Sequence, residues 1–173
     1  LPAKAYKAAI DFLENCRKQQ HGEEKCVSKT GWVGKYLLLL ENALVMEASS
    51  QLHATALTAM LAVAAEYSSV YGEMYVSRYN TLLMRFVSHI DGGAREAAAK
   101  LLGILVSSSG TMMGGDKLIL PMLETVRGET KPKFEELDGS ITALGFLTAM
   151  NDKNNAIIIA KVEPALHAIL KTG

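Results

Sequence analysis

Small and apolar residues recur along this chain in a pattern that repeats at a nearly constant interval. Three eight-residue stretches begin with a small residue at Ala56, Ala97 and Gly139, and each ends in the order apolar, apolar, small, apolar. The two intervals between these starting points are 41 and 42 residues. Apolar residues at such spacings gather on one face of a helix. The pattern therefore predicts three equivalent helices.

A repeat of about 40–47 residues is typical of HEAT and armadillo helical arrays. The predicted fold is therefore all-α, a HEAT/armadillo-like α-solenoid of antiparallel helix pairs with about eight helices. Each unit of such an array buries its apolar face only against its neighbours, and the array presents long faces to partners. A protein–protein interaction scaffold is the first functional hypothesis.

The hydrophobic periodicity and the turn signals predict where these helices and units lie. The expected helices cover residues 2–20, 32–47, 50–69, 73–90, 94–107, 116–126, 133–150 and 156–171. They form a single segment, 1–173, with units at about 1–30, 31–70, 71–110, 111–152 and a partial unit at 153–173. Neither end shows the charged face of a capping repeat. We therefore expect the chain to be a piece of a longer protein.

Several residues carry specific expectations about packing. The first helix is expected to place its apolar stripe at Ala5, Ala8, Phe12 and Cys16. Gly103 and Gly145 occupy the same repeat position and predict a close approach of a neighbouring helix. Asp91 in a turn and Arg95 in the first turn of the next helix predict bonds that join neighbouring units. Met60, Met84 and Met122 occupy core-like positions.

Composition narrows the range of partners. Lys plus Arg and Asp plus Glu are both 18, and a net charge of zero argues against nucleic acid, because phosphate binding needs a surplus of cations. The two cysteines, Cys16 and Cys26, are too few for a disulfide framework. No apolar run approaches the ~18 residues of a membrane span, so we expect no direct membrane insertion.

The motifs that resemble catalytic or ligand sites are all incomplete. Residues 110–117 resemble a phosphate-binding loop, but Asp116 stands before Lys117, and Leu118 replaces the hydroxyl residue. Cys16, His21 and Cys26 are spaced by five but lack a fourth zinc ligand nearby. We therefore expect no cofactor and no metal, and we interpret Cys16 as a free buried thiol.

The remaining titratable residues do not form a catalytic set either. His53, His89 and His167 lie in three different units, and His53 is interpreted as a packing or capping residue. The carboxylates of residues 23–24 and 135–136 are interpreted as solvated, whereas acid–base catalysis needs a positioned group with a tuned pKa. The chain is therefore predicted not to be an enzyme.

An ordered set of short stretches goes beyond the general repeat. They are residues 41–44, 52–56, 77–79, 83–90, 95–104 and 134–146. Together they resemble the middle region of the giant HEAT-repeat proteasome adaptor and scaffold family, over roughly residues 36–150. The resemblance implies that the parent protein binds subunits of the 26S proteasome, tethers the core particle to the regulatory particle and acts in quality control. It also implies a cytoplasmic and nuclear location.

Two alternatives remain open. Another HEAT or armadillo adaptor, such as a transport receptor or a phosphatase scaffold, would share the repeat. A HEAT-fold DNA glycosylase is more remote, because it needs a basic groove with central aromatic residues, and Trp32 is the only tryptophan. As candidate partner-binding residues we take Glu96 and Lys100, which point away from the apolar stripe of their helix.

Overall fold

The computed structural model describes residues 2–19, 29–47, 49–67, 73–108, 115–128, 131–150 and 155–172. Within these ranges the regular structure consists of eight α-helices. They are α1 (Ala3–Gln19), α2 (Lys29–Val45), α3 (Ser50–Glu66), α4 (Glu73–Val87), α5 (Gly92–Ser108), α6 (Gly115–Arg127), α7 (Phe134–Ala149) and α8 (Asn155–Thr172). The all-α prediction is confirmed for this part of the chain.

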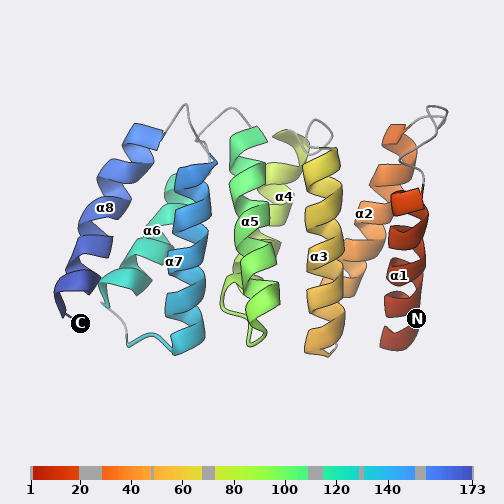
Figure 1. Ribbon diagram of the computed structural model, residues 1–173, viewed down its shortest axis with the longest axis horizontal. Coiled ribbons are helices and arrows are strands. Elements are labelled where there is room, and N and C mark those ends of the chain that lie inside the picture. The colour runs from red at the N-terminus through yellow and green to blue at the C-terminus, as the bar shows by residue number, and fades with distance from the viewer. Residues whose placement is uncertain are drawn as a thin grey trace.

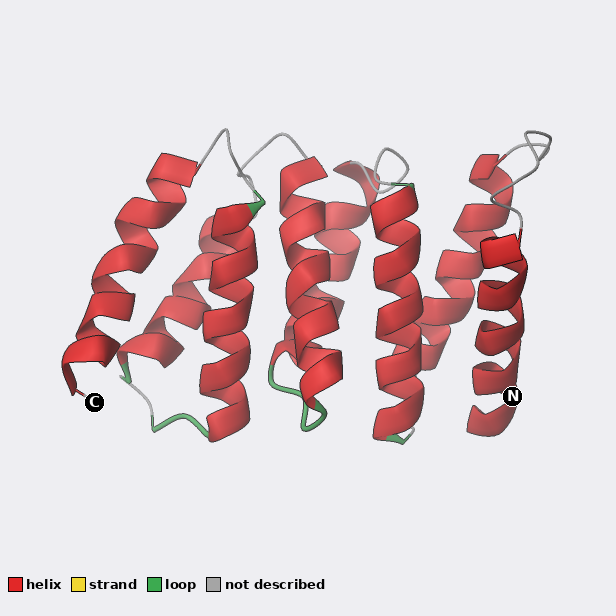
Figure 2. Cartoon of the chain, viewed as in Figure 1, coloured by secondary structure: helices red, strands yellow, loops and turns green. Residues whose placement is uncertain are grey.

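The helices stand side by side in two rows (Figure 1). One row holds α1, α3, α5 and α7, and each of these contacts the next. Helices α2, α4 and α6 lie behind this row, and α8 packs against α6 and α7. The described residues of the α2–α3, α4–α5 and α6–α7 connections lie at the same edge (Figure 2), so α3, α5 and α7 start at one edge and run in the same direction.

The helix ends differ from the predicted ones by up to three residues where local hydrogen bonds determine them. We predicted that the fourth helix would reach residue 90, but α4 ends at Val87, and the His89 amide bonds to the carbonyl of Phe86. Asp91 then accepts a hydrogen bond from the Ala94 amide at 2.8 Å, so α5 begins at Gly92 rather than at residue 94. An Asp side chain satisfies a free amide in the first turn of a helix and so favours an early start.

A continuous core runs between the rows. It contains the expected Met60 and Met122, which are fully buried or nearly so, and Met84 packs against it while partly buried. The apolar stripe of α5 is fully enclosed by α3, α4 and α7. Leu101, Leu102 and Leu105 have no exposed surface. Such enclosure on several sides is how a helix row buries apolar area that a single pair could not.

Two glycines permit close helix contacts. A Cβ atom at Gly139 of α7 would lie 1.6 Å from the carbonyl oxygen of Val87 at the end of α4. At Gly103 of α5 it would lie 2.8 Å from Sδ of Met150 and 3.2 Å from the carbonyl oxygen of Phe146. The prediction of close packing is therefore confirmed at Gly103. It is wrong at Gly145, which is exposed and has no atom within 4 Å of such a Cβ, because this residue borders an open groove between α7 and α8.

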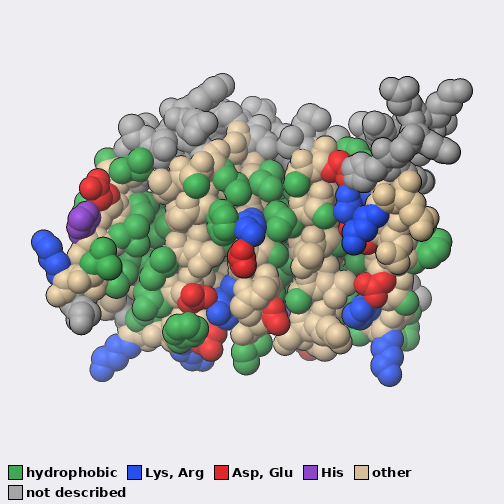
Figure 3. Space-filling model, in the orientation of Figure 1, with side chains coloured by type: hydrophobic (Ala, Val, Ile, Leu, Met, Phe, Trp, Pro, Cys, Tyr) green, Lys and Arg blue, Asp and Glu red, His purple; other side chains and the backbone are tan. Residues whose placement is uncertain are grey.

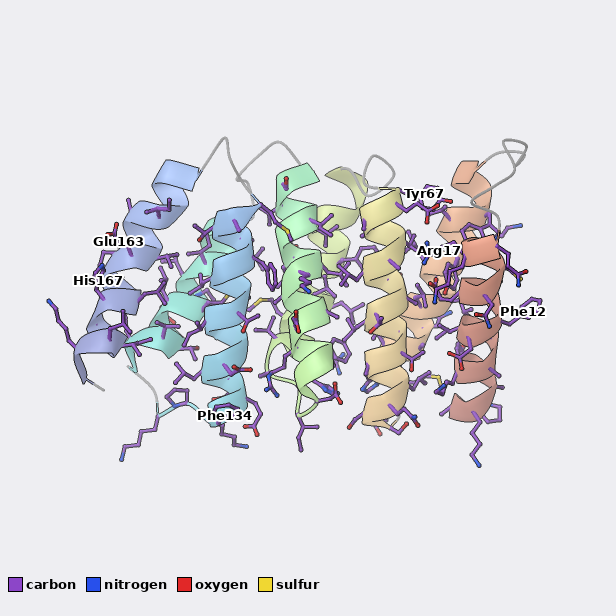
Figure 4. All side chains as sticks on the ribbon, in the orientation of Figure 1. Phe12, Arg17, Tyr67, Phe134, Glu163 and His167 are labelled. Carbon is purple, nitrogen blue, oxygen red and sulfur yellow. The ribbon has the colours of Figure 1, made fainter. Side chains whose placement is uncertain are left out.

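The expected apolar face of α1 is also wrong. Phe12 is 66% exposed and points away from the helix rows (Figure 4), Ala8 is exposed, and Cys16 is a free thiol that is only partly buried. The buried side of α1 instead contains Ile10 and Arg17, with Leu13 packed against the core. Helix α1 has two apolar stripes of similar helical spacing, and the stripe that includes Ile10 and Leu13 is the one that faces α3.

No helix in the described ranges has both the length and the apolar character needed to cross a membrane.

Candidate protein interaction surface

Arg95 joins two helices of the front row. Its Nε donates to Asp138 Oδ2 of α7 at 2.8 Å, and its Nη1 donates to the carbonyls of His89 and Ile90 at 2.8 and 3.1 Å. The guanidinium also lies 5.9 Å from the centre of the Phe134 ring. Arg95 therefore ties α5 to α7 and to the end of the α4–α5 connection. This confirms the predicted structural role of Arg95, whereas Asp91 caps its own helix rather than bonding to a neighbouring unit.

The two candidate contact residues, Glu96 and Lys100, follow Arg95 on α5 and pair with each other. Lys100 Nζ lies 2.7 Å from Glu96 Oε1, and it also lies 5.4 Å from the centre of the Phe146 ring of α7. Both charged side chains keep a substantial exposed surface. An i, i+4 ion pair on an exposed helix face contributes little to stability, so both groups can exchange this pairing for a partner's charges.

The face that carries this pair has mixed charge. Figure 3 shows scattered acidic and basic side chains over α5 and its neighbours, with hydrophobic side chains between them. A cation beside an aromatic ring and a carboxylate can bind a carboxylate, a hydrogen-bond donor and an apolar side chain at one place. This combination is suited to a polypeptide ligand.

The structure also contains an ionic cluster that the sequence patterns did not predict. Arg17 of α1 is 9% exposed, donates to Glu14 Oε2 at 2.8 Å and bonds to Glu66 of α3. Tyr36 of α2 donates its hydroxyl to Glu14 Oε1 at 2.8 Å (Arg17 is labelled in Figure 4). The hydrogen bond with Glu14 raises the pKa of Arg17, and burial followed by the hydrogen bond to Glu14 raises the pKa of Tyr36. The cluster joins α1, α2 and α3 and so helps to hold these three helices together.

Two histidines, His53 and His89, lie next to each other close to the Arg95 contact. The His53 ring lies 5.2 Å from the Phe86 ring and 5.6 Å from the His89 ring, and its Nε2 lies 3.0 Å from the carbonyl oxygen of Met46. The interpretation of His53 as a packing residue agrees with these contacts. His89 accepts a hydrogen bond at Nδ1 from the Asp91 amide at 3.1 Å. Burial, and then the charge of His53, lower the pKa of His89.

The other candidate residues are not brought together. His167 pairs weakly with Glu163 at 3.6 Å on the exposed side of α8. Glu136 caps α7 by accepting from the Lys133 amide at 2.9 Å. In the part of the chain that the structure describes, no group of three His, Cys, Asp or Glu side chains could hold a metal. His21, Cys26, the carboxylates at 23–24 and the side chains of 110–117 lie outside the described residues.

None of the family models, curated proteins or solved structures that were compared with this chain matches it. Its function is therefore inferred from the geometry above and from the sequence resemblance.

Proposed function

We propose that this chain is a segment of a non-catalytic protein–protein interaction scaffold with a HEAT/armadillo-like α-solenoid fold. The observation that carries the proposal is the packing of α3, α5 and α7. Each contacts both the front-row helix before it and the helix that immediately precedes it in the chain. Repetition of one packing unit along a row is how solenoids extend a binding surface.

The partner we propose is the 26S proteasome, with the protein acting as an adaptor that tethers its core and regulatory particles in the cytoplasm and the nucleus. Support comes from the ordered resemblance over residues 36–150 to the giant HEAT-repeat proteasome adaptors. Residues 95–104 of that resemblance lie on α5, which is central in the row and carries the exposed Glu96–Lys100 pair. We take this pair as the candidate contact with a proteasome subunit.

The proposal is tested by affinity purification of the tagged protein from cell extract, followed by mass spectrometry. We expect the intact parent protein to recover proteasome subunits. We expect a parent protein that lacks residues 1–173 to recover fewer of them. Absence of proteasome subunits from both samples would overturn the proteasome assignment.

The contact pair is tested by charge reversal in the same protein. Glu96→Lys combined with Lys100→Glu keeps the ion pair on α5 but exchanges the positions of the positive and negative charges that a partner would contact. The matched control is Lys35→Glu combined with Glu124→Lys, since both residues are exposed on the second row. Equal recovery with the two double variants would remove Glu96 and Lys100 from the contact.

The alternative adaptors, a transport receptor or a phosphatase scaffold, are distinguished by which proteins the purification recovers. The DNA glycosylase alternative is tested by base release from damaged DNA. With 18 cationic and 18 anionic side chains, the chain offers little attraction to phosphate, and we expect no activity.

A further inference from the structure

A small cavity lies between α4, α6 and α7. Helices α4 and α6 stand in the second row, and both contact α7 (Figure 1). Helix α5 packs against α4 and α7 on one side, and α8 packs against α6 and α7 on the other, so the cavity lies within the array rather than at its end. Its volume is about 200 Å³. Pockets for drug-sized ligands usually measure about 300–1,000 Å³, so this one is of a size to hold a single side chain.

Two sides of the cavity are apolar. Met84 and Val87 of α4 line one side, and Pro121 and Met122 of α6 line the other. A Cβ atom at Gly139 of α7 would lie 1.6 Å from the carbonyl oxygen of Val87, so α7 packs directly on the end of α4 beside the cavity. This packing holds the walls in place before a ligand binds, and a preformed site loses little affinity to ordering.

The rest of the lining is polar. Ser140 of α7 is only 5% exposed and lines the cavity, and its hydroxyl has no hydrogen-bond partner among the described residues. Thr125 of α6 donates its hydroxyl to the Pro121 carbonyl at 2.9 Å, which leaves the Thr125 oxygen as an acceptor. The exposed Ser88 adds a third hydroxyl. Buried polar groups are nearly always paired, so the Ser140 hydroxyl points to a ligand with polar atoms.

Glu136 gives the cavity its charge. Its Oε2 accepts a hydrogen bond from the Lys133 amide at 2.9 Å, and its Oε1 has no hydrogen bond within the described part of the chain. Glu136 is the one charged residue among the described residues that line the cavity. The side chains of Arg85, Arg127 and Lys133 are exposed and do not line it. The cavity therefore presents a carboxylate and hydroxyl oxygens without a cation from these helices.

We propose that this cavity binds the side chain of an arginine on a partner protein, with the guanidinium on Glu136 and Ser140 and the aliphatic stem along the apolar walls. A guanidinium has five N–H donors in a planar fork and no acceptor, which suits a carboxylate with hydroxyl oxygens beside it. A lysine ammonium has fewer donors and acts as a point charge, so it would pair fewer of these oxygens. The methylene groups of arginine are readily buried along apolar surface. The proposal rests on the scaffold function and gives it a contact separate from the ion pair on α5.

The test is an NMR titration of the 173-residue chain, isotope-labelled at its methionine methyl groups, with N-acetyl-arginine methylamide as the probe. Met84 and Met122 line the cavity, whereas Met60 is buried in the core and does not line it. We expect saturable shifts of the Met84 and Met122 methyl signals and none of the Met60 signal. The citrulline counterpart, in which a neutral urea replaces the guanidinium, should bind about tenfold more weakly or worse, and the lysine counterpart should also bind more weakly.

Two variants of α7 test the polar contacts. Glu136→Gln should weaken arginine binding about tenfold or more, because the charge is lost while the amide oxygen can still accept from the Lys133 amide. Ser140→Ala should weaken it severalfold. The matched control is Glu135→Gln, which removes the same charge from the first turn of α7 at a residue that does not line the cavity.

The proposal is overturned if the Met84 and Met122 signals show no saturable shift. It is also overturned if the citrulline or lysine compound binds as tightly as the arginine compound, or if Glu135→Gln and Glu136→Gln weaken binding equally. These measurements use the purified chain alone. Failure of the titration would therefore leave the proteasome proposal standing, and absence of proteasome subunits from the affinity purification would leave the arginine site standing.

Discussion

Arg95 Nε and Asp138 Oδ2 lie 2.8 Å apart, although the residues are 43 positions apart in the chain, close to one repeat interval. The Arg95 guanidinium is almost fully buried, whereas the Asp138 side chain is 41% exposed. Loss of the two partners therefore has unequal consequences. Removing Asp138 leaves Arg95 with the two carbonyls it already bonds, whereas removing Arg95 leaves those carbonyls without their donor.

Replacement of Arg95 by Met should lower the free energy of unfolding by roughly 2–4 kcal/mol, because the nearly buried guanidinium and its three charged hydrogen bonds are lost. Urea denaturation followed by circular dichroism measures this loss. Lys100→Met on the same helix serves as the control and should cost at most about 1 kcal/mol, since that ion pair is exposed. Equal losses for the two variants would contradict the role given to Arg95.

Truncation of Leu101 to Ala should cost roughly 2–5 kcal/mol through lost burial and the cavity that remains. Leu101 has no exposed surface in the centre of α5. The matched variant is Leu38→Ala on α2, where half of the side chain is exposed, and its cost should stay below about 1 kcal/mol. A loss below about 1 kcal/mol for Leu101→Ala in chemical denaturation would refute its assignment to the core.

The two α7 glycines should respond to alanine with opposite signs. At Gly139 the new Cβ meets the Val87 carbonyl, and we expect a loss of about 1–3 kcal/mol or more. At Gly145 the Cβ meets open space, and the better helix propensity of alanine should add about 0.5–1 kcal/mol. Thermal unfolding of the two variants under identical conditions measures both effects. A fall in Tm for Gly145→Ala would show that this side of α7 is covered.

Stability should fall on mild acidification because the pKa of His89 is lowered by burial and by His53. The unfolded chain binds a proton at His89 as the pH falls through about 6.5, whereas the folded chain binds it only at lower pH. The contribution of His89 is therefore complete above that value and is lost below it.

The His89 contribution can be isolated by comparing wild type with His89→Gln in denaturation at pH 7.5 and pH 5.5. The stability difference, wild type minus variant, should be smaller at pH 5.5. A difference that does not change with pH would exclude a shifted His89. His167→Gln is the control, since that residue is exposed on α8.

The sequence predicted the positions of the helices well, but it predicted less well which side of each helix is buried. The apolar stripes of α3, α5 and α7 could be recognised because Ala56, Ala97 and Gly139 repeat in register, and three instances support each other. Helix α1 has no such partner in the chain, and its two stripes could not be ranked by spacing alone. The buried stripe is the one that contains Arg17. The sequence alone could not predict that this charged residue is buried, because its burial depends on the ion pairs with Glu14 and Glu66.

For the candidate surface, the sequence could predict only what lies on one helix. Glu96 and Lys100 are four residues apart, so their pairing and exposure follow from helix geometry. The proximity of Phe146 to Lys100 depends on how α7 lies on α5, which no local pattern specifies. The same holds for Gly145, because its repeat position predicted contact while its surroundings depend on what lies beside α7.

The row of helices has a consequence for synthesis of the protein. Substantial helix contacts join elements at most three apart along the chain, and the contacts of α1 are with α2 and α3. A nascent chain that has left the ribosome as far as Glu66 therefore already contains the helices that α1 needs. Short loops close at little entropic cost, and contacts between nearby segments form quickly. Such a polypeptide can fold from its amino end while the rest is still being translated, and little apolar surface has to wait for distant sequence.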